Sequence, residues 1–300
     1  MSLPALYKIN LKTAAADRAA LVDYCLENSV IGVGWGAHYF RDDLPNGFDD
    51  YYAGVKETWG SKSTGPVRWL HDADVGSLVW FRDLKGNYYL ARLTGSWRLL
   101  HGDESEHLDL ANVRDVDYEL VGSEAGVPGA VIRGYAAPKQ WAFSHVNEDG
   151  ARAYSAVLAH ELLGCDLPDI ELSASSVLSS LLGPLDVEDL VAAFLQDTRG
   201  YIALPARHAR STQAYEYVLK HREDGHVAVV QVKTGGATVP VGTLDERTAD
   251  RWFVYSDSGQ DLPDFVERVP RESLIEYMES GSMCLPPIIE VWMRRVAKAG

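Results

Sequence analysis

Residues 215–235 read YEYVLKHREDGHVAVVQVKTG, and this stretch decides the fold of the C-terminal half. Two β-rich runs flank the dipeptide Asp224-Gly225, which is preferred in two-residue type I′ hairpin turns. With that turn, Glu216 lies directly opposite Lys233. Cross-strand partners and residues two apart share one face of a sheet. The sequence therefore predicts that Glu216, Gln231 and Lys233 converge on one face of a β-hairpin.

These three side chains suit metal-dependent phosphodiester hydrolysis. Carboxylate and amide oxygens are hard ligands for Mg²⁺ or Mn²⁺, and a bound cation activates water and offsets charge on phosphate. The ammonium group of Lys233 can neutralise negative charge that develops during the reaction. The alternative is a cross-strand Glu–Lys pair on an exposed face, which contributes about 1 kcal/mol or less.

The elements around the hairpin extend the prediction to a whole domain. An amphipathic helix is expected at 186–196, strands at 201–204 and 251–255, a helix near 245–250 and a closing helix at 287–298.

In this order of elements, residues 184–260 resemble the restriction-endonuclease (PD-(D/E)XK) fold, in particular its Mrr-like branch, whose terminal acid-x-Lys reads Gln-x-Lys. The resemblance implies that Gln231 and Lys233 form that pair. It also places Glu216 at the metal-binding Asp position and Glu188 at the acid of the first helix. The chain departs from the family in having Glu216 instead of Asp. For Glu188 a favourable interaction with the helix dipole is an equally good explanation.

The N-terminal half is rich in tryptophan, with six of the eight in the first 141 residues. Alternating and β-rich runs predict a small β-barrel-like domain with one or two helices. The expected elements are strands at 5–11, 30–35, 77–83, 87–94 and 130–135, and a helix at 14–27.

Across residues 5–140 this pattern resembles the PUA-like superfamily, particularly its EVE and YTH-type branches. Several of these domains read modified bases in an aromatic cage. The resemblance implies that Trp35, Trp80 and Trp97 are candidate cage residues, because a flipped base needs aromatic faces for stacking. Arg82 and Arg98 are candidates for holding the nucleic-acid backbone. The competing explanation is that these tryptophans are core residues.

The expected fold class is therefore a mainly β (α+β) PUA-like domain joined to an α/β restriction-endonuclease-like domain. The reader domain is placed at 1–145, a helix and linker at 146–183 and the nuclease domain at 184–300. A helix is expected at 149–164 within the connecting stretch.

Composition and charge limit the function classes. No apolar run approaches the roughly 20 residues of a membrane helix, and the three cysteines are scattered, so a cytoplasmic protein without a membrane partner is expected. The net charge is −15. Residues 101–200 hold 18 Asp/Glu against 5 Lys/Arg, so the acidic excess lies outside the hairpin and does not exclude phosphate binding there.

The sequence as a whole predicts a modification-dependent DNA endonuclease of a bacterial defence type. Its partner is double-stranded DNA with a modified base, and a homodimer is expected because two sites cut two strands most easily. Two alternatives stay open: a nucleic-acid-binding protein with a silent nuclease fold, and an RNA-directed reader.

Overall fold

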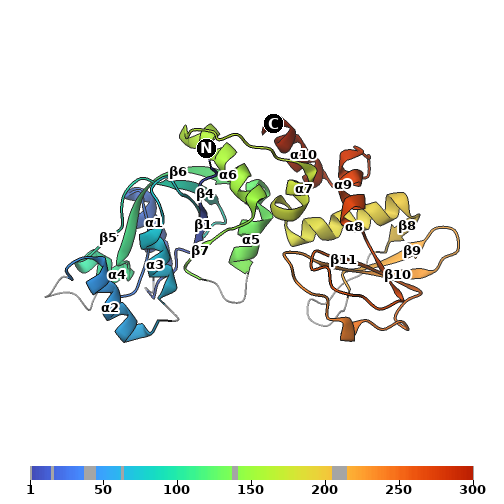
Figure 1. Cartoon of the computed structure of the whole chain (residues 1–300), viewed down its shortest axis with the longest axis horizontal. Coiled ribbons are helices and arrows are strands. Elements are labelled where there is room, and N and C mark those ends of the chain that lie inside the picture. The colour runs from blue at the N-terminus through green and yellow to red at the C-terminus, as the bar shows by residue number, and fades with distance from the viewer. Residues whose placement is uncertain are drawn as a thin grey trace. The chain divides into compact units, whose positions relative to one another are not determined.

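The chain divides into two compact units, Met1–Ile170 and Glu171–Gly300 (Figure 1). The division falls inside the stretch 146–183, which the sequence assigned to a helix and linker, and the helix of that stretch packs on unit 1. The computed structural model describes residues 2–14, 17–36, 45–61, 64–136, 141–204 and 215–299.

Unit 1 is built on a curled sheet with the strand order β2-β6-β4-β3-β1-β7, and β5 also pairs with β6. Strands β1 and β3 are parallel, and the other pairs are antiparallel. The strands are β1 (Leu6–Ile9), β2 (Val30–Val33), β3 (Leu78–Arg82), β4 (Tyr88–Leu93), β5 (Arg98–Leu99), β6 (Asn112–Gly122) and β7 (Phe143–His145).

Helices contribute to a core on each face of this sheet. One core joins the sheet to α1, α2 and α3, and the other joins it to α5 and α6. Strand β3 shows why both faces are apolar, since Val79 and Phe81 enter the first core while Trp80 enters the second. The helices are α1 (Arg18–Glu27), α2 (Phe48–Trp59), α3 (Gly65–Asp72), α4 (Asp103–Leu108), η2 (Glu124–Gly126), α5 (Gly129–Ala136) and α6 (Asp149–Leu163).

The helix content of unit 1 is higher than the sequence predicted. The expected strand at 130–135 is wrong, because these residues form helix α5. The carbonyl of Pro128 accepts hydrogen bonds from the N–H groups of Val131 and Ile132 and so starts the helix. Packing of Val131 and Tyr135 against the sheet outweighs the β propensity of the run.

Unit 2 is a mixed α/β domain whose sheet has the order β12-β11-β10-β9-β8. Strands β8, β9 and β10 form an antiparallel meander, and β11 and β12 continue it in parallel. Helix α8 lies along this sheet (Figure 1). The elements are α7 (Ala174–Ser176), η3 (Val177–Leu181), α8 (Pro184–Thr198), β8 (Tyr201–Ala203), β9 (Tyr217–His221), β10 (Val227–Lys233), η4 (Val241–Thr243), β11 (Arg251–Ser256), β12 (Val266–Arg268), α9 (Arg271–Glu279) and α10 (Pro287–Ala299).

The crossover from β10 to β11 carries no α-helix, so the helix expected near 245–250 is wrong. The Asp245 carboxylate accepts the N–H of Arg247 at 3.0 Å, and the Asp245 carbonyl accepts the N–H of Thr248 at 2.9 Å. The Asp250 carboxylate accepts the N–H of Val227 at 2.7 Å. The Asp245 bond to Arg247 is a local side-chain bond of the kind that competes with helix formation, and the bond from Val227 holds Asp250 beside β10. The helices expected at 149–164, 186–196 and 287–298 are confirmed.

Candidate active site

The hairpin between β9 and β10 turns over four residues, 222–225. The N–H of His221 donates to the carbonyl of His226 at 3.0 Å, and the N–H of Gly225 donates back to the carbonyl of His221 at 3.2 Å. The carboxylate of Asp224 accepts the N–H of His226 at 3.2 Å. The prediction of a two-residue turn is therefore wrong, because these bonds stabilise a wider loop.

The register of the hairpin is displaced by two residues from the predicted one. Val218 pairs with Val229, whereas the two-residue turn would pair it with Gln231. Continued by one residue beyond the paired segment, this register sets Glu216 opposite Gln231 and diagonal to Lys233. Because side chains alternate with a period of two, an even displacement keeps each of them on its predicted face.

Glu216 and Lys233 meet as predicted. The Lys233 ammonium donates to Glu216 Oε1 at 3.2 Å, and the backbone N–H of Val232 donates to Glu216 Oε2 at 3.0 Å. Glu216 immediately precedes β9, so its carboxylate accepts an N–H of β10 beyond the paired part of β9. The side chains of Glu216 and Lys233 are 17% and 29% exposed, so this ion pair is partly shielded from solvent, unlike a surface pair.

Glu188 on α8 faces the same charges. Its pKa is raised to about 7, first because the carboxyl is partly buried and second because the negative charge of Glu216 is close, while Lys233 acts in the opposite direction. The next residue, Asp189, accepts a hydrogen bond from the Tyr217 hydroxyl. That bond ties α8 to β9 next to Glu188.

Gln231 lies on β10 between Val230 and Val232 and is 4% exposed. Its Oε1 atom is buried and has no hydrogen-bond partner among the described residues. A buried acceptor without a donor costs about 1–3 kcal/mol. Such an atom is suited to binding a cation, which would satisfy its lone pairs.

The donor set of this site fits a hard divalent cation. Glu188 and Glu216 supply carboxylate oxygens and Gln231 supplies an unsatisfied amide oxygen, which are ligand types of Mg²⁺ and Mn²⁺. A cation would also reduce the repulsion that raises the pKa of Glu188.

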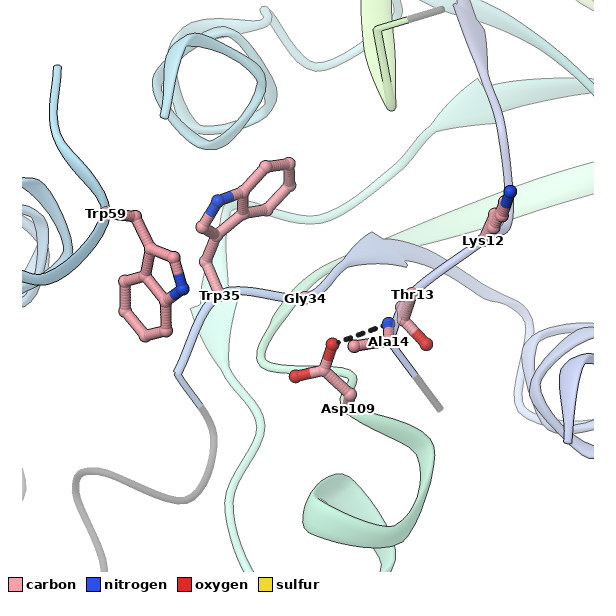
Figure 2. Close-up of a pocket in the computed structure, with 7 residues that line it drawn as sticks. All are labelled: Lys12, Thr13, Ala14, Gly34, Trp35, Trp59 and Asp109. Atoms are coloured by element: carbon pink, nitrogen blue, oxygen red, sulfur yellow. Dashed lines mark hydrogen bonds between the residues drawn. The ribbon is translucent and has the colours of Figure 1, made fainter. Parts of the chain in front are cut away.

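Unit 1 contains a separate pocket of about 300 Å³ that includes one predicted cage residue, Trp35. In Figure 2 the indoles of Trp35 and Trp59 stand on one side of the pocket and Asp109 on the other. One carboxylate oxygen of Asp109 accepts the N–H of Ala14 at 2.9 Å, and the other accepts no hydrogen bond from any described residue. The described lining residues are Lys12, Thr13, Ala14, Gly34, Trp35, Trp59 and Asp109.

The backbone at Trp35 is held in a conformation that tryptophan seldom adopts. Its φ is +67°, in the left-handed region. The Tyr51 hydroxyl donates to the Trp35 carbonyl, and the amide of Asn112 donates to the Gly34 carbonyl at 2.5 Å. A Cβ at Gly34 would lie 2.7 Å from the Asp109 carboxylate, so only glycine fits there. Backbone strain of this kind is concentrated at functional sites.

The other two predicted cage residues stabilise the fold of unit 1. Trp80 is fully buried, and its indole N–H donates to the Ser155 hydroxyl at 2.9 Å, so the prediction that it faces a ligand is wrong. Trp97 is not among the described lining residues; its N–H donates to Asn112 at 3.0 Å and so supports the residue that fixes the pocket loop.

Trp59 is, with Lys12, Thr13 and Asp109, among the pocket residues that the sequence analysis missed. It is the last residue of α2, a helix that was not expected. A periodicity of apolar residues at helical spacing was available as a signal: they occupy positions 48, 51, 52, 55 and 59.

The two predicted arginines differ in their surroundings. Arg98 is exposed and forms an ion pair with Asp115 at 3.1 Å. The Arg82 guanidinium lies 4.6 Å from the Tyr135 ring centroid, and the Lys8 ammonium lies 5.0 Å from the same centroid. Lys8 is 4% exposed, and its pKa is lowered to about 8 by burial and then by the charge of Arg82.

Comparison with known proteins gives no match to a family model, a curated protein or a solved structure. Within the described residues, no helix has the length and apolarity required to cross a bilayer. The assignment of function therefore depends on the geometry of the two sites.

Proposed function

We propose that this chain is a metal-dependent endonuclease that cleaves DNA carrying a modified base, with unit 2 performing hydrolysis and unit 1 reading the base. One observation carries the proposal: the Glu216–Lys233 ion pair lies beside Gln231, whose buried amide oxygen has no donor among the described residues. A buried acceptor without a donor lowers the stability of the protein, so a purely structural role does not account for this combination. The same residues supply the groups that phosphodiester hydrolysis requires.

The residues of unit 2 have distinct roles in this proposal. A Mg²⁺ or Mn²⁺ ion held by Glu188, Glu216 and Gln231 would activate water and offset charge on the phosphate. Lys233 is oriented by Glu216 and neutralises the negative charge that grows on the attacked phosphate. Glu188 changes its protonation state near neutral pH, so cation binding at this site is linked to proton release.

The pocket of unit 1 supports the reader role. Its volume is at the lower end of the range for small-ligand sites, which suits one extruded base. Stacking on an indole contributes about 1–3 kcal/mol per base, enough to offset much of the unstacking cost. The second carboxylate oxygen of Asp109, which accepts no hydrogen bond from the described residues, can accept one from an exocyclic amino group, as acidic side chains do with cytosine N4.

The test is cleavage of a plasmid panel by the wild-type chain in Mg²⁺, Mn²⁺ or EDTA. The plasmids are unmodified or carry 5-methylcytosine, 5-hydroxymethylcytosine, glucosylated cytosine or N6-methyladenine. Lys233→Ala is compared with Lys220→Ala, which removes an exposed lysine from β9 of the same hairpin. We expect cation-dependent cutting of one modified plasmid, a loss of at least 100-fold in Lys233→Ala and no loss in Lys220→Ala.

The other outcomes are equally informative. Cutting of every plasmid would retain the nuclease and refute the reader. Binding of modified DNA without cutting in any cation would refute the nuclease activity and favour a silent nuclease fold. Glu216 in place of Asp would then be the first explanation to test for the lost activity. Preferential binding of single-stranded RNA in competition would refute DNA as the partner. Whether both strands are cut in one binding event tests the proposed homodimer.

A further inference from the structure

A second group of metal-ligand side chains lies in the β9–β10 loop. His221, Asp224 and His226 each offer one ligand atom, and these atoms all lie within 4.8 Å of one another. Asp224 Oδ1 is 2.9 Å from His221 Nδ1 and 2.5 Å from His226 Nδ1. The loop joins the ends of β9 and β10 that are remote from Glu216 and Lys233, so this group is separate from the candidate active site.

The surroundings hold both imidazole rings in place. The rings of His221 and His226 are stacked, with centroids 4.8 Å apart and planes inclined by 14°. His226 Nε2 lies 2.7 Å from the hydroxyl of Tyr201, a residue of β8 that is 3% exposed. Gly200 leaves room for His221, because a Cβ there would lie 3.3 Å from His221 Nε2.

The contact of His226 with Tyr201 resembles the hydrogen bonds that metal-binding histidines make through their second ring nitrogen. A ligating imidazole donates its second ring N–H to an oxygen, which fixes the tautomer and presents the other nitrogen to the ion. The contact between His226 Nε2 and the Tyr201 hydroxyl has that arrangement and leaves Nδ1 directed toward Asp224.

We propose that His221, Asp224 and His226 bind one Zn²⁺ ion. Two imidazole nitrogens and one carboxylate oxygen favour zinc and its neighbours in the transition series over Mg²⁺. Zinc bonds of about 2.0–2.2 Å in tetrahedral geometry place the ligand atoms about 3.4 Å apart, so the Asp224 oxygen must move away from both imidazole nitrogens. Asp224 is exposed in the loop and can move outward by the few tenths of an ångström to 1 Å that this needs.

The proposed ion joins three strands. It bridges the ends of β9 and β10 directly, and it reaches β8 through the Tyr201–His226 contact. Three protein ligands leave a fourth position for water. Zinc at this end of the hairpin would stabilise the strands that carry Glu216 and Lys233 at the other end.

The experiment uses the full, untagged chain after treatment with EDTA and dialysis. Co²⁺ is titrated as a spectroscopic probe, Zn²⁺ then competes for it, and the melting temperature is measured with and without Zn²⁺. We expect one equivalent of Co²⁺ with a tetrahedral visible spectrum, displacement by Zn²⁺ but not by excess Mg²⁺, and a Zn²⁺-dependent rise in melting temperature.

Variants decide whether the ion is in this loop. His221→Ala and His226→Ala should each weaken Co²⁺ binding at least tenfold and abolish the thermal shift, whereas His107→Ala, at an exposed histidine of α4, should change neither. Asp224→Asn is the mildest variant and should also weaken binding. Absence of stoichiometric Co²⁺ in the wild type, or unchanged binding in His226→Ala, would overturn the proposal.

The proposal is independent of the nuclease assignment. Glu216→Gln and Lys233→Ala should keep the Co²⁺ spectrum while losing cleavage. Loss of the spectrum in Glu216→Gln alone would place the ion at the active site and overturn the loop site.

Discussion

The raised pKa of Glu188 makes a quantitative prediction about Glu188→Gln. The pKa rises from 4.5 in an unstructured chain to about 7 in the folded protein. At pH values between these two, the unfolded chain has released the proton and the native protein has retained it. The contribution of Glu188 to the free energy of unfolding of the wild type therefore falls as pH rises from 4.5 to about 7, and this contribution falls no further above 7.

The magnitude follows from the size of this shift. At 1.36 kcal/mol per pKa unit, ionisation of Glu188 in the folded protein would lower the free energy of unfolding by roughly 3 kcal/mol. Glu188 is only half-buried, so solvent screening reduces the expected effect to about 1–2 kcal/mol. Glutamine carries no charge at any pH, so Glu188→Gln should match the wild type below pH 4.5 and exceed its stability by that amount above pH 7.

The assay is urea unfolding of the metal-free chain at several pH values, with the transitions of the two units fitted separately. Glu223→Gln is the control, because Glu223 is exposed in the hairpin loop. Addition of Mg²⁺ should stabilise the wild type more than Glu188→Gln, since a cation favours the charged carboxylate. A stability difference that is independent of pH, or an equal response to Mg²⁺, would refute this account of Glu188.

Three further predictions concern buried or stacked side chains. Gln231→Leu replaces the unpartnered amide by an apolar group of similar size, so chemical denaturation of the metal-free chain should show a gain of about 1 kcal/mol, with loss of Mg²⁺-dependent cleavage. Trp59→Ala should weaken binding of the preferred modified duplex by about 1–3 kcal/mol in fluorescence anisotropy, without affecting cleavage chemistry in unit 2. Trp80→Ala should destabilise unit 1 by about 3–5 kcal/mol in thermal unfolding, because it empties a fully buried site and leaves Ser155 without its donor. Unchanged duplex affinity in the Trp59 variant would remove it from the reader site, and a native-like melt of the Trp80 variant would contradict its core position.

The candidate active site contains two unfavourable features in the metal-free protein. A partly buried carboxyl faces another negative charge, and a buried amide oxygen has no donor in the part of the chain that the structure describes. Functional sites often keep such costs because a ligand relieves them. The expected gain in stability and loss of cleavage in Gln231→Leu would show this trade-off directly.

The sequence of the hairpin was sufficient to predict that Glu216 and Lys233 meet. Alternation along two strands fixed the face of each side chain, and that face is preserved even though the predicted turn was two residues too short. The helical spacing of apolar residues also fixed α8, and with it the placement of Glu188 near the start of a helix.

Contacts between distant segments decided features of the fold and of the pocket that local sequence patterns could not predict. The run 130–135 has high β propensity but forms a helix, because its apolar side chains pack against the sheet of unit 1. Trp35, Trp80 and Trp97 look alike in sequence, yet one lines a pocket, one is wholly buried and one supports a neighbouring residue. The period of a strand or helix is a property of the local backbone, so the sequence alone determined it. Which face is covered, and which indole remains open to a ligand, depends on contacts between segments far apart in the chain, and only the folded structure decided them.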